Sequence, residues 1–171
     1  MPTDPQPASP ASTGSPAPDW RDCEPARRLL AWNPGAVVAG EFARGELALT
    51  LAAAALPAVA AWLRDEPELR FDMLVDITCV DWLPAEPRFA LVYEIYSTTR
   101  RHWLRLKVRT AASEPVPSLA AVWPSANWFE REIFDLFGVS FAGHPFLRRI
   151  LMPDNWEGHP MRKDYPVEGY R

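Results

Sequence analysis

The chain has 171 residues (19.3 kDa), with 18 Lys and Arg against 22 Asp and Glu, a formal net charge of -4 and a pI near 5.4. This length gives one ordinary domain with tails. The acidic balance argues against a protein that tracks nucleic-acid phosphates. Two cysteines, Cys23 and Cys79, are too few for a four-thiolate zinc or iron–sulfur site. One disulfide is formally open to them, but nothing marks the chain as secreted, so we expect reduced thiols.

Residues 1–19 are rich in Pro, Ala and Ser and lack both a cationic start and an apolar run. This composition predicts a disordered tail and argues against a signal peptide. The stretch from Leu47 to Leu63 is the candidate for a membrane span. It has 17 residues, is dominated by Ala and is interrupted by Pro57. That is the lower length limit for crossing a bilayer, so we expect any membrane association to come through a partner.

Hydrophobic spacing predicts an α+β domain over residues 20–137. Strands joined mostly by hairpins favour an antiparallel or mixed sheet that helices cover on one face. The expected elements are a helix over 20–32, a hairpin of 37–42 and 46–51, a helix over 57–63, a strand over 71–80, and a hairpin of 89–95 and 104–108. The chain lacks G-x-G-x-x-G, and after Gly138 and Gly143 a histidine stands where a phosphate-binding loop needs lysine. A doubly wound nucleotide fold is therefore not expected.

Alternation assigns faces to two of these strands. In the strand over 71–80, Phe71, Met73, Val75, Ile77 and Cys79 share one face, which makes Cys79 a core thiol. In the last strand, three cations point away from the core: Arg105, Lys107 and Arg109. This row is explained either by a solvated or edge-protecting face or by a docking surface for an acidic partner.

A helix over Trp128 to Phe137 is predicted, with Asn127 and Glu130 as a capping pair and Gly138 as its end. On it, Arg131 and Asp135 have the spacing of an i,i+4 ion pair. Three acids, Glu130, Glu132 and Asp135, fall close together in the sequence. Because Glu130 and Glu132 diverge around the helix and no histidine lies at a ligand spacing, ion pairing at the helix surface or at an interface is favoured over a metal site.

After Gly138 the periodicity stops, although residues 138–171 stay as apolar as a core. A buried irregular backbone needs partners for its N–H and C=O groups, and Arg148, Arg149, Arg162 and Lys163 are suitable donors to the carbonyls. We expect an extended arm that docks on a second chain, because its apolar surface exceeds what a domain of this size needs for itself. His144-Pro145 and His159-Pro160 are better explained by hydrogen-bonded structural histidines than by a catalytic or metal site.

The signature of a known family lies in this region. It runs through Glu130–Val139, Phe141, Gly143-His144-Pro145, Leu147–Met152 and Gly158–Pro166, and the upstream segments Val75–Asp81, Val92–Ser97 and Trp123–Trp128 also resemble the family. The pattern resembles the C subunit, also called the 30 kDa subunit, of NADH:quinone oxidoreductase (respiratory complex I), over roughly Val37 to Pro166. Met161 departs from the family's usual leucine, which conserves volume. The signature and interface residues that the resemblance implies are Glu130, Arg131, Glu132, Asp135, Phe137, Gly138, Gly143, His144, Pro145, Arg148, Arg149, Gly158, Pro160, Arg162, Lys163 and Asp164.

The resemblance implies a structural subunit without a catalytic, metal or cofactor site of its own. It implies that the chain packs on the large quinone-pocket subunit, next to the terminal iron–sulfur subunit, among the other subunits of the peripheral arm. FMN, iron–sulfur clusters and quinone are then bound by other subunits. The expected location is the cytoplasmic face of the bacterial inner membrane, reached only through the complex.

Two other hypotheses come from the same residues. The fold also suits the equivalent subunit of a membrane-bound hydrogenase or of a dehydrogenase fed by another donor, although the complete signature favours the NADH enzyme. A stand-alone metal-dependent hydrolase using Glu132, Asp135 and His144 rests only on their proximity in sequence.

Overall fold

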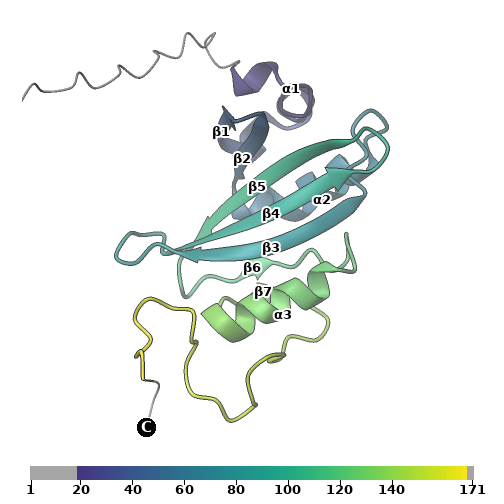
Figure 1. The fold of residues 1–171 in the computed structure, drawn as a ribbon. Helices are drawn as coiled ribbons and strands as arrows, with labels where there is room; N and C mark the ends of the chain where they lie inside the picture. The colour runs from purple at the N-terminus through teal and green to yellow at the C-terminus, as the bar shows by residue number, and fades with distance from the viewer. Residues whose placement is uncertain (1–18, 169–171) are drawn as a thin grey trace, which may run out of the picture.

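The computed structural model describes residues 19–168, so nearly all of the predicted disordered tail lies outside the described residues. The chain forms an α+β fold, as predicted (Figure 1). Its helices are α1 (Glu24–Trp32), α2 (Leu56–Asp65) and α3 (Ala126–Phe137), with short 3-10 turns at Trp20–Asp22, Pro34–Ala36 and Ala53–Ala55. Its strands are β1 (Val37–Ala43), β2 (Glu46–Leu51), β3 (Met73–Asp81), β4 (Phe89–Ser97), β5 (His102–Thr110), β6 (Val116–Pro117) and β7 (Phe141–Ala142).

The main sheet has the order β1-β2-β5-β4-β3. Both predicted hairpins are present, because β1 pairs antiparallel with β2 and β4 pairs antiparallel with β5. The sheet is mixed, since β2 and β5 run parallel and thereby join the first hairpin to the β3-β4-β5 meander. Two-residue strands β6 and β7 form a second, parallel pair that the sequence did not predict. This pair ties the segment after α3 back to the loop before it.

One face of the sheet carries the core. Alternate residues of β4 and β5 are fully buried, whereas their neighbours on the other face are only partly buried. Helix α2 lies behind the long strands in Figure 1 and α3 runs alongside β3. The buried side chains that share this core include Val59, Leu63, Leu91, Tyr93, Ile95, Leu104, Leu106, Val108, Ile133 and Phe137. Helices therefore cover one face, as the alternation predicted.

Strand β3 departs from the predicted alternation. Its pairing with β4 shifts register between Leu74 and Asp76, so Val75 is the extra residue of a β-bulge. A bulge moves the residues before it to the opposite face. Leu74 is consequently buried and Met73, which was assigned to the core face, is 47% exposed. Ile77 and Cys79 lie beyond the bulge and are buried as predicted, and burial raises the pKa of the Cys79 thiol to about 12.

Two of the three cations of β5 face acids of the sheet, whereas Arg109 donates to Pro87 O and lies over the ring of Trp82. Arg105 forms ion pairs with Glu94 on β4 and with Glu46 on β2, and Lys107 lies 3.8 Å from Glu41 on β1. The two Arg105 contacts cross neighbouring strands, where opposite charges stabilise pairing, whereas Lys107 reaches past β2 to β1. The stretch considered above as a membrane span is divided between β2 and α2. Within residues 19–168, no helix has both the length and the apolar character needed to span a bilayer.

Gly40 in β1 sits directly beneath the ring of Trp20. A Cβ at this position would lie 2.2 Å from the indole, which is closer than any side-chain contact allows. We expect Gly40→Ala to displace Trp20 and to lower the free energy of unfolding by about 1–3 kcal/mol, measured by urea denaturation. The matched control is Gly35→Ala, where the nearest atom is 3.7 Å away. An equal loss in both variants would contradict a specific role for the Trp20 contact.

Candidate functional site: helix α3 and the C-terminal arm

An α-helix leaves its last four carbonyl groups without intrahelical partners. In α3 these are the carbonyls of Phe134, Asp135, Leu136 and Phe137. The C-terminal arm, defined as the described residues 138–168, turns back along α3 and supplies a donor to each of them. The donors are Gly138 N (2.9 Å) to Phe134, His159 Nδ1 (2.9 Å) and Arg149 Nη1 (3.2 Å) to Asp135, Met161 N (3.0 Å) to Leu136, and Arg162 Nε (2.5 Å) to Phe137.

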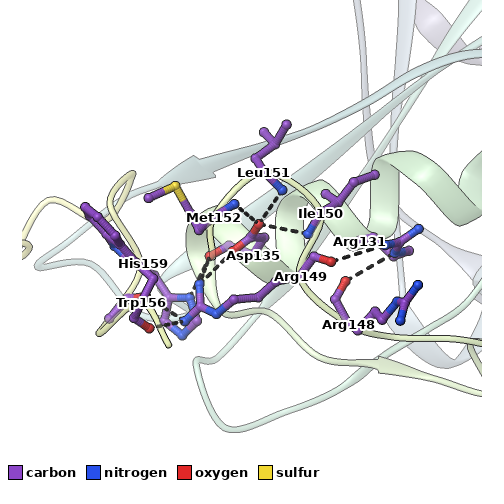
Figure 2. Close-up of polar contacts among 10 residues, drawn as sticks. Arg131, Asp135, Arg148, Arg149, Ile150, Leu151, Met152, Trp156 and His159 are labelled. Atoms are coloured by element: carbon purple, nitrogen blue, oxygen red, sulfur yellow. Dashed lines mark hydrogen bonds and ion pairs between the residues drawn. The ribbon is translucent and has the colours of Figure 1, made fainter. Parts of the chain in front are cut away.

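The carboxylate of Asp135 is the centre of the arm's fold (Figure 2). Its Oδ2 accepts three successive backbone N–H groups, from Ile150 (3.0 Å), Leu151 (2.8 Å) and Met152 (2.8 Å). Its Oδ1 accepts from Arg149 Nη1 at 2.6 Å. Successive N–H groups that converge on one anion form a nest, which stabilises the ionised form. Burial alone would raise the pKa of Asp135, but these donors together lower it.

The predicted ion pair between Arg131 and Asp135 is wrong. Arg131 instead donates to two arm carbonyls, from Nε to Arg148 O (3.2 Å) and from Nη2 to Arg149 O (3.1 Å). Asp135 is paired with Arg149, which is 14 residues away in sequence. Helical spacing correctly indicated that both side chains form polar contacts, but it predicted the wrong partners. The arm supplies acceptors for Arg131 and donors for Asp135.

The predicted donors to the arm carbonyls divide into two groups. Arg149 donates to arm carbonyls as predicted, from Nη2 to Trp156 O (3.1 Å) and Gly158 O (3.0 Å). Arg162 donates instead to the carbonyl of Phe137, the last residue of α3. The guanidinium of Arg148 lies over the ring of Phe146, 4.0 Å from the centroid. For Lys163 it is the backbone N–H that is used, and it donates to Asp81 Oδ2 at 2.9 Å.

A second carboxylate cluster holds the far end of the arm. Arg88, buried just before β4, makes paired hydrogen bonds with Asp81 (2.9 and 2.7 Å) and with Asp164 (2.9 and 2.6 Å). The Arg88 hydrogen bonds hold the pKa values of both carboxyls below their usual range. Sequence reasoning missed Asp81 and Arg88 as site residues, because only the returning arm brings Asp164 and Lys163 beside them.

Gly138 ends α3 as predicted, with φ of 72° in the left-handed region. The arm adds a second requirement at this position. His159 and Arg162 lie so close that a Cβ on Gly138 would be 2.5 Å from both side chains. The glycine therefore serves both the helix end and the close return of the arm.

The predicted capping role of Glu130 is also wrong. The residue before α3 is Ser125, which makes no side-chain capping bond, and the Glu130 carboxylate turns inward to accept from Leu119 N (2.6 Å) and Ser118 Oγ (2.5 Å). Glu130 is fully buried and not at the helix surface, and its burial raises its pKa to about 7. His144 Nε2 lies 3.9 Å from this carboxylate. Of the three acids on α3, only Glu132 is exposed.

Both histidines of the His-Pro pairs make hydrogen bonds to the backbone. His144 Nε2 is 3.1 Å from Asn127 O, and its Nδ1 accepts from Phe146 N at 3.0 Å. His159 is used at the end of α3. The trio of Glu132, Asp135 and His144, considered above for a hydrolase, is not brought together as one centre, since Asp135 is enclosed by arm donors and Glu132 faces outward. Across residues 19–168, no three His, Cys, Asp or Glu side chains are grouped so as to hold a metal ion.

Several backbone groups of the arm are hydrogen-bonded to α3, whereas much of the arm's apolar side-chain surface is exposed. Val139 and Phe141 join the core, and Leu147 packs against it. Beyond them, large apolar side chains are between 38% and 60% exposed: Phe146, Leu151, Trp156 and Met161. Trp128, at the start of α3, is 61% exposed. We call these five side chains the apolar arm surface. The chain thus holds the arm with its own hydrogen bonds but leaves the apolar arm surface uncovered.

Fold and arm define a class of α+β domain whose last helix is capped by its own returning chain. Comparison with known proteins identifies the family. The family model for "Respiratory-chain NADH dehydrogenase, 30 Kd subunit" matches residues 49–171. The C subunit of NADH-quinone oxidoreductase from Roseiflexus sp. (strain RS-1) is 49% identical over 141 residues, which cover 82% of this chain and 81% of that protein. The C subunit from Rhodobacter capsulatus is 42% identical over 138 residues, covering 81% of this chain and 69% of that protein.

A solved structure agrees with this assignment. The chain described as "Nqo5 of the trypsin-resistant fragment (1-134) in P63 form" superposes with a TM-score of 0.62 at 30% identity, over 72% of this chain and 99% of that one. The present chain therefore belongs to the family of the 30 kDa subunit, the C subunit, of respiratory-chain NADH dehydrogenase. The resemblance seen in the sequence is confirmed.

Replacing Asp135 tests whether its carboxylate holds the arm in place. We expect Asp135→Asn to lower the free energy of local opening at residues 150–152 by about 3 kcal/mol, because three N–H groups and Arg149 lose a charged acceptor. Hydrogen exchange of these amides measures the change. The control is Asp154→Asn, an exposed carboxylate of the same arm. Because the Asp135 pKa is lowered on folding, its contribution is present at neutral pH and is lost on acidification below its ordinary value of 3.8.

Glu130 has the opposite pH dependence. Between pH 4.5 and about 7 the unfolded chain ionises this carboxyl while the folded chain keeps its proton. The free energy of unfolding should therefore fall as pH rises through this window, by an amount on the order of 3 kcal/mol. Glu130→Gln should remove that fall, whereas Glu132→Gln, on the exposed side of the same helix, should keep it. Denaturant unfolding at pH values from 4.5 to 7.5 measures this dependence. If the free energy of unfolding varied with pH in the same way in wild type and in Glu130→Gln, the raised pKa of Glu130 would be contradicted.

Proposed function

We propose that this chain is a non-catalytic structural and assembly subunit of the hydrophilic arm of proton-translocating NADH:quinone oxidoreductase. In this role it holds the neighbouring subunits in the geometry that passes electrons from NADH through FMN and iron–sulfur clusters to quinone. Those cofactors are bound by other subunits, and none is expected here. Its partners are the large quinone-pocket subunit and the terminal iron–sulfur subunit. The chain then lies at the cytoplasmic face of the bacterial inner membrane and reaches the membrane only through the complex.

The observation that supports this proposal is the apolar arm surface on a rigidly held backbone. The N–H groups of residues 150–152 are bonded to Asp135, and the carbonyls of Arg148 and Arg149 are bonded to Arg131, so this part of the arm is already ordered when a partner binds. Binding then loses little conformational entropy, and the burial of exposed Trp, Phe, Leu and Met side chains supplies the affinity. A surface of this kind suits a permanent contact between subunits.

The names of the relatives support the NADH enzyme over the hydrogenase alternative. The proteins that match at 42% to 49% identity are C subunits of NADH-quinone oxidoreductase from several bacteria. The hydrolase alternative has no supporting observation in the described residues, because Asp135 and His144 have separate hydrogen-bond partners and Glu132 is exposed.

The apolar arm surface is tested by the double variant Leu151→Asp, Met161→Asp. Both side chains are more than half exposed, so the isolated chain should fold normally. We expect the amount of assembled complex and the NADH:quinone reductase activity to fall together by about tenfold or more, because two charges would be buried without partners. The measurements are native gels and activity of membranes from cells that carry the variant.

The matched control is Val38→Asp, which places a charge on an exposed apolar residue of β1, outside the arm. It should leave assembly unchanged. Normal assembly of the double variant would contradict the docking role, and normal assembly with lost activity would indicate a catalytic contribution from the arm.

A further inference from the structure

Two consecutive arginines of the arm have opposite surroundings. Arg149 is turned inward and uses its guanidinium on the Asp135 carboxylate and on the carbonyls of Asp135, Trp156 and Gly158. Arg148 is exposed, and its guanidinium makes neither a hydrogen bond nor an ion pair with any residue of the described range 19–168. In Figure 2 the dashed line at Arg148 ends on its carbonyl oxygen, and none reaches its guanidinium.

The Arg148 side chain is nonetheless held in position. Its backbone carbonyl is fixed by Arg131, and the next residue is fixed by Asp135. Its guanidinium stacks on the exposed ring of Phe146, 4.0 Å from the centroid. Stacking on an aromatic face leaves the N–H donors at the edge of the guanidinium free to bind a partner. Arg148 is therefore a cation with little orientational freedom and a full set of unused donors.

The surroundings of Arg148 indicate which kind of partner it suits. Arg131 lies between the rings of Trp128 and Phe146, 5.3 and 5.7 Å from their centroids, so the three side chains form one apolar and cationic ladder beside Arg148. Both rings are more than half exposed. Arginine with exposed Trp and aromatic neighbours is the composition of an interface hot spot. A planar guanidinium in such a place fits a carboxylate, which accepts two parallel N–H groups.

We propose that Arg148 is the charged anchor of the apolar arm surface and binds an Asp or Glu side chain of the partner subunit that covers Trp128 and Phe146. This inference rests on the proposed function, because it names the chemistry of the group that the same surface receives. Arg149, by contrast, only positions the arm. The partner carboxylate completes the hydrogen bonding of Arg148. The rings of Trp128 and Phe146 exclude water from this ion pair, so removal of either charge is costly.

The experiment places Arg148→Glu, Arg148→Lys and the control Arg27→Glu in the full chain in cells. Arg27 is an exposed arginine of α1, outside the arm. We expect Arg148→Glu to lower the assembled complex by about tenfold or more, Arg148→Lys to give an intermediate amount that falls further in a salt wash, and Arg27→Glu to match wild type. A charge reversal from Asp or Glu to Arg in the partner subunit should restore assembly with Arg148→Glu.

The unfolding midpoint of the purified full-length chain separates docking from folding. Arg148→Glu should leave the midpoint unchanged, whereas Arg149→Ala should lower it. A lowered midpoint for Arg148→Glu overturns the inference, since it would show an internal role. Wild-type assembly of Arg148→Glu, together with loss of assembly in Leu151→Asp, Met161→Asp, also overturns it and leaves the proposed function standing. Wild-type assembly of both variants contradicts the proposed function itself.

Discussion

The structure depends on the unsatisfied end of one helix. The last four carbonyls of α3 lie at the negative end of its dipole, where cations and N–H donors are favoured. The chain meets this need by returning along α3 and placing Arg149, His159 and Arg162 at that end. A segment without helix or long strand is thereby given a fixed course. Its order comes from α3 and not from a periodic pattern of its own.

Asp135 decides which way the arm faces. Its carboxylate gathers the N–H groups of residues 150–152 and the guanidinium of Arg149, so the backbone of this stretch must turn toward α3. Side chains that do not fit under the backbone are then directed outward, and Leu151 is 60% exposed as a result. The contact with the Asp135 carboxylate therefore both holds the arm backbone against α3 and leaves apolar side chains of the arm exposed. The Asp81–Arg88–Asp164 cluster, in which Asp81 and Arg88 are buried and Asp164 is exposed, holds the far end of the arm in a similar way.

Sequence patterns predicted the elements well wherever the cause was local. Alternation located the strands β4 and β5, and Gly138 marked the end of α3 because a left-handed residue is needed there. The bulge at Val75 was not predictable, since a single extra residue leaves hydrophobic spacing almost unchanged. The partners of Arg131 and Asp135 were missed for a different reason: i,i+4 geometry considers one helix, whereas the actual partners lie 14 to 18 residues further along the chain.

Arg148 and Arg149 show how hydrogen bonds inside the chain can determine which side chains form its docking surface. Leu147 packs against the core and Arg149 is held by Asp135, while Arg148 between them is exposed. The inward contacts of its two neighbours fix the backbone at Arg148, and its guanidinium stacks on the ring of Phe146. A family member that kept the Asp135 nest would present its residue at this position outward regardless of which partner it meets. The direction of the docking surface is thus fixed by folding, and what remains for the partner to determine is the chemistry of the side chains that the fold displays.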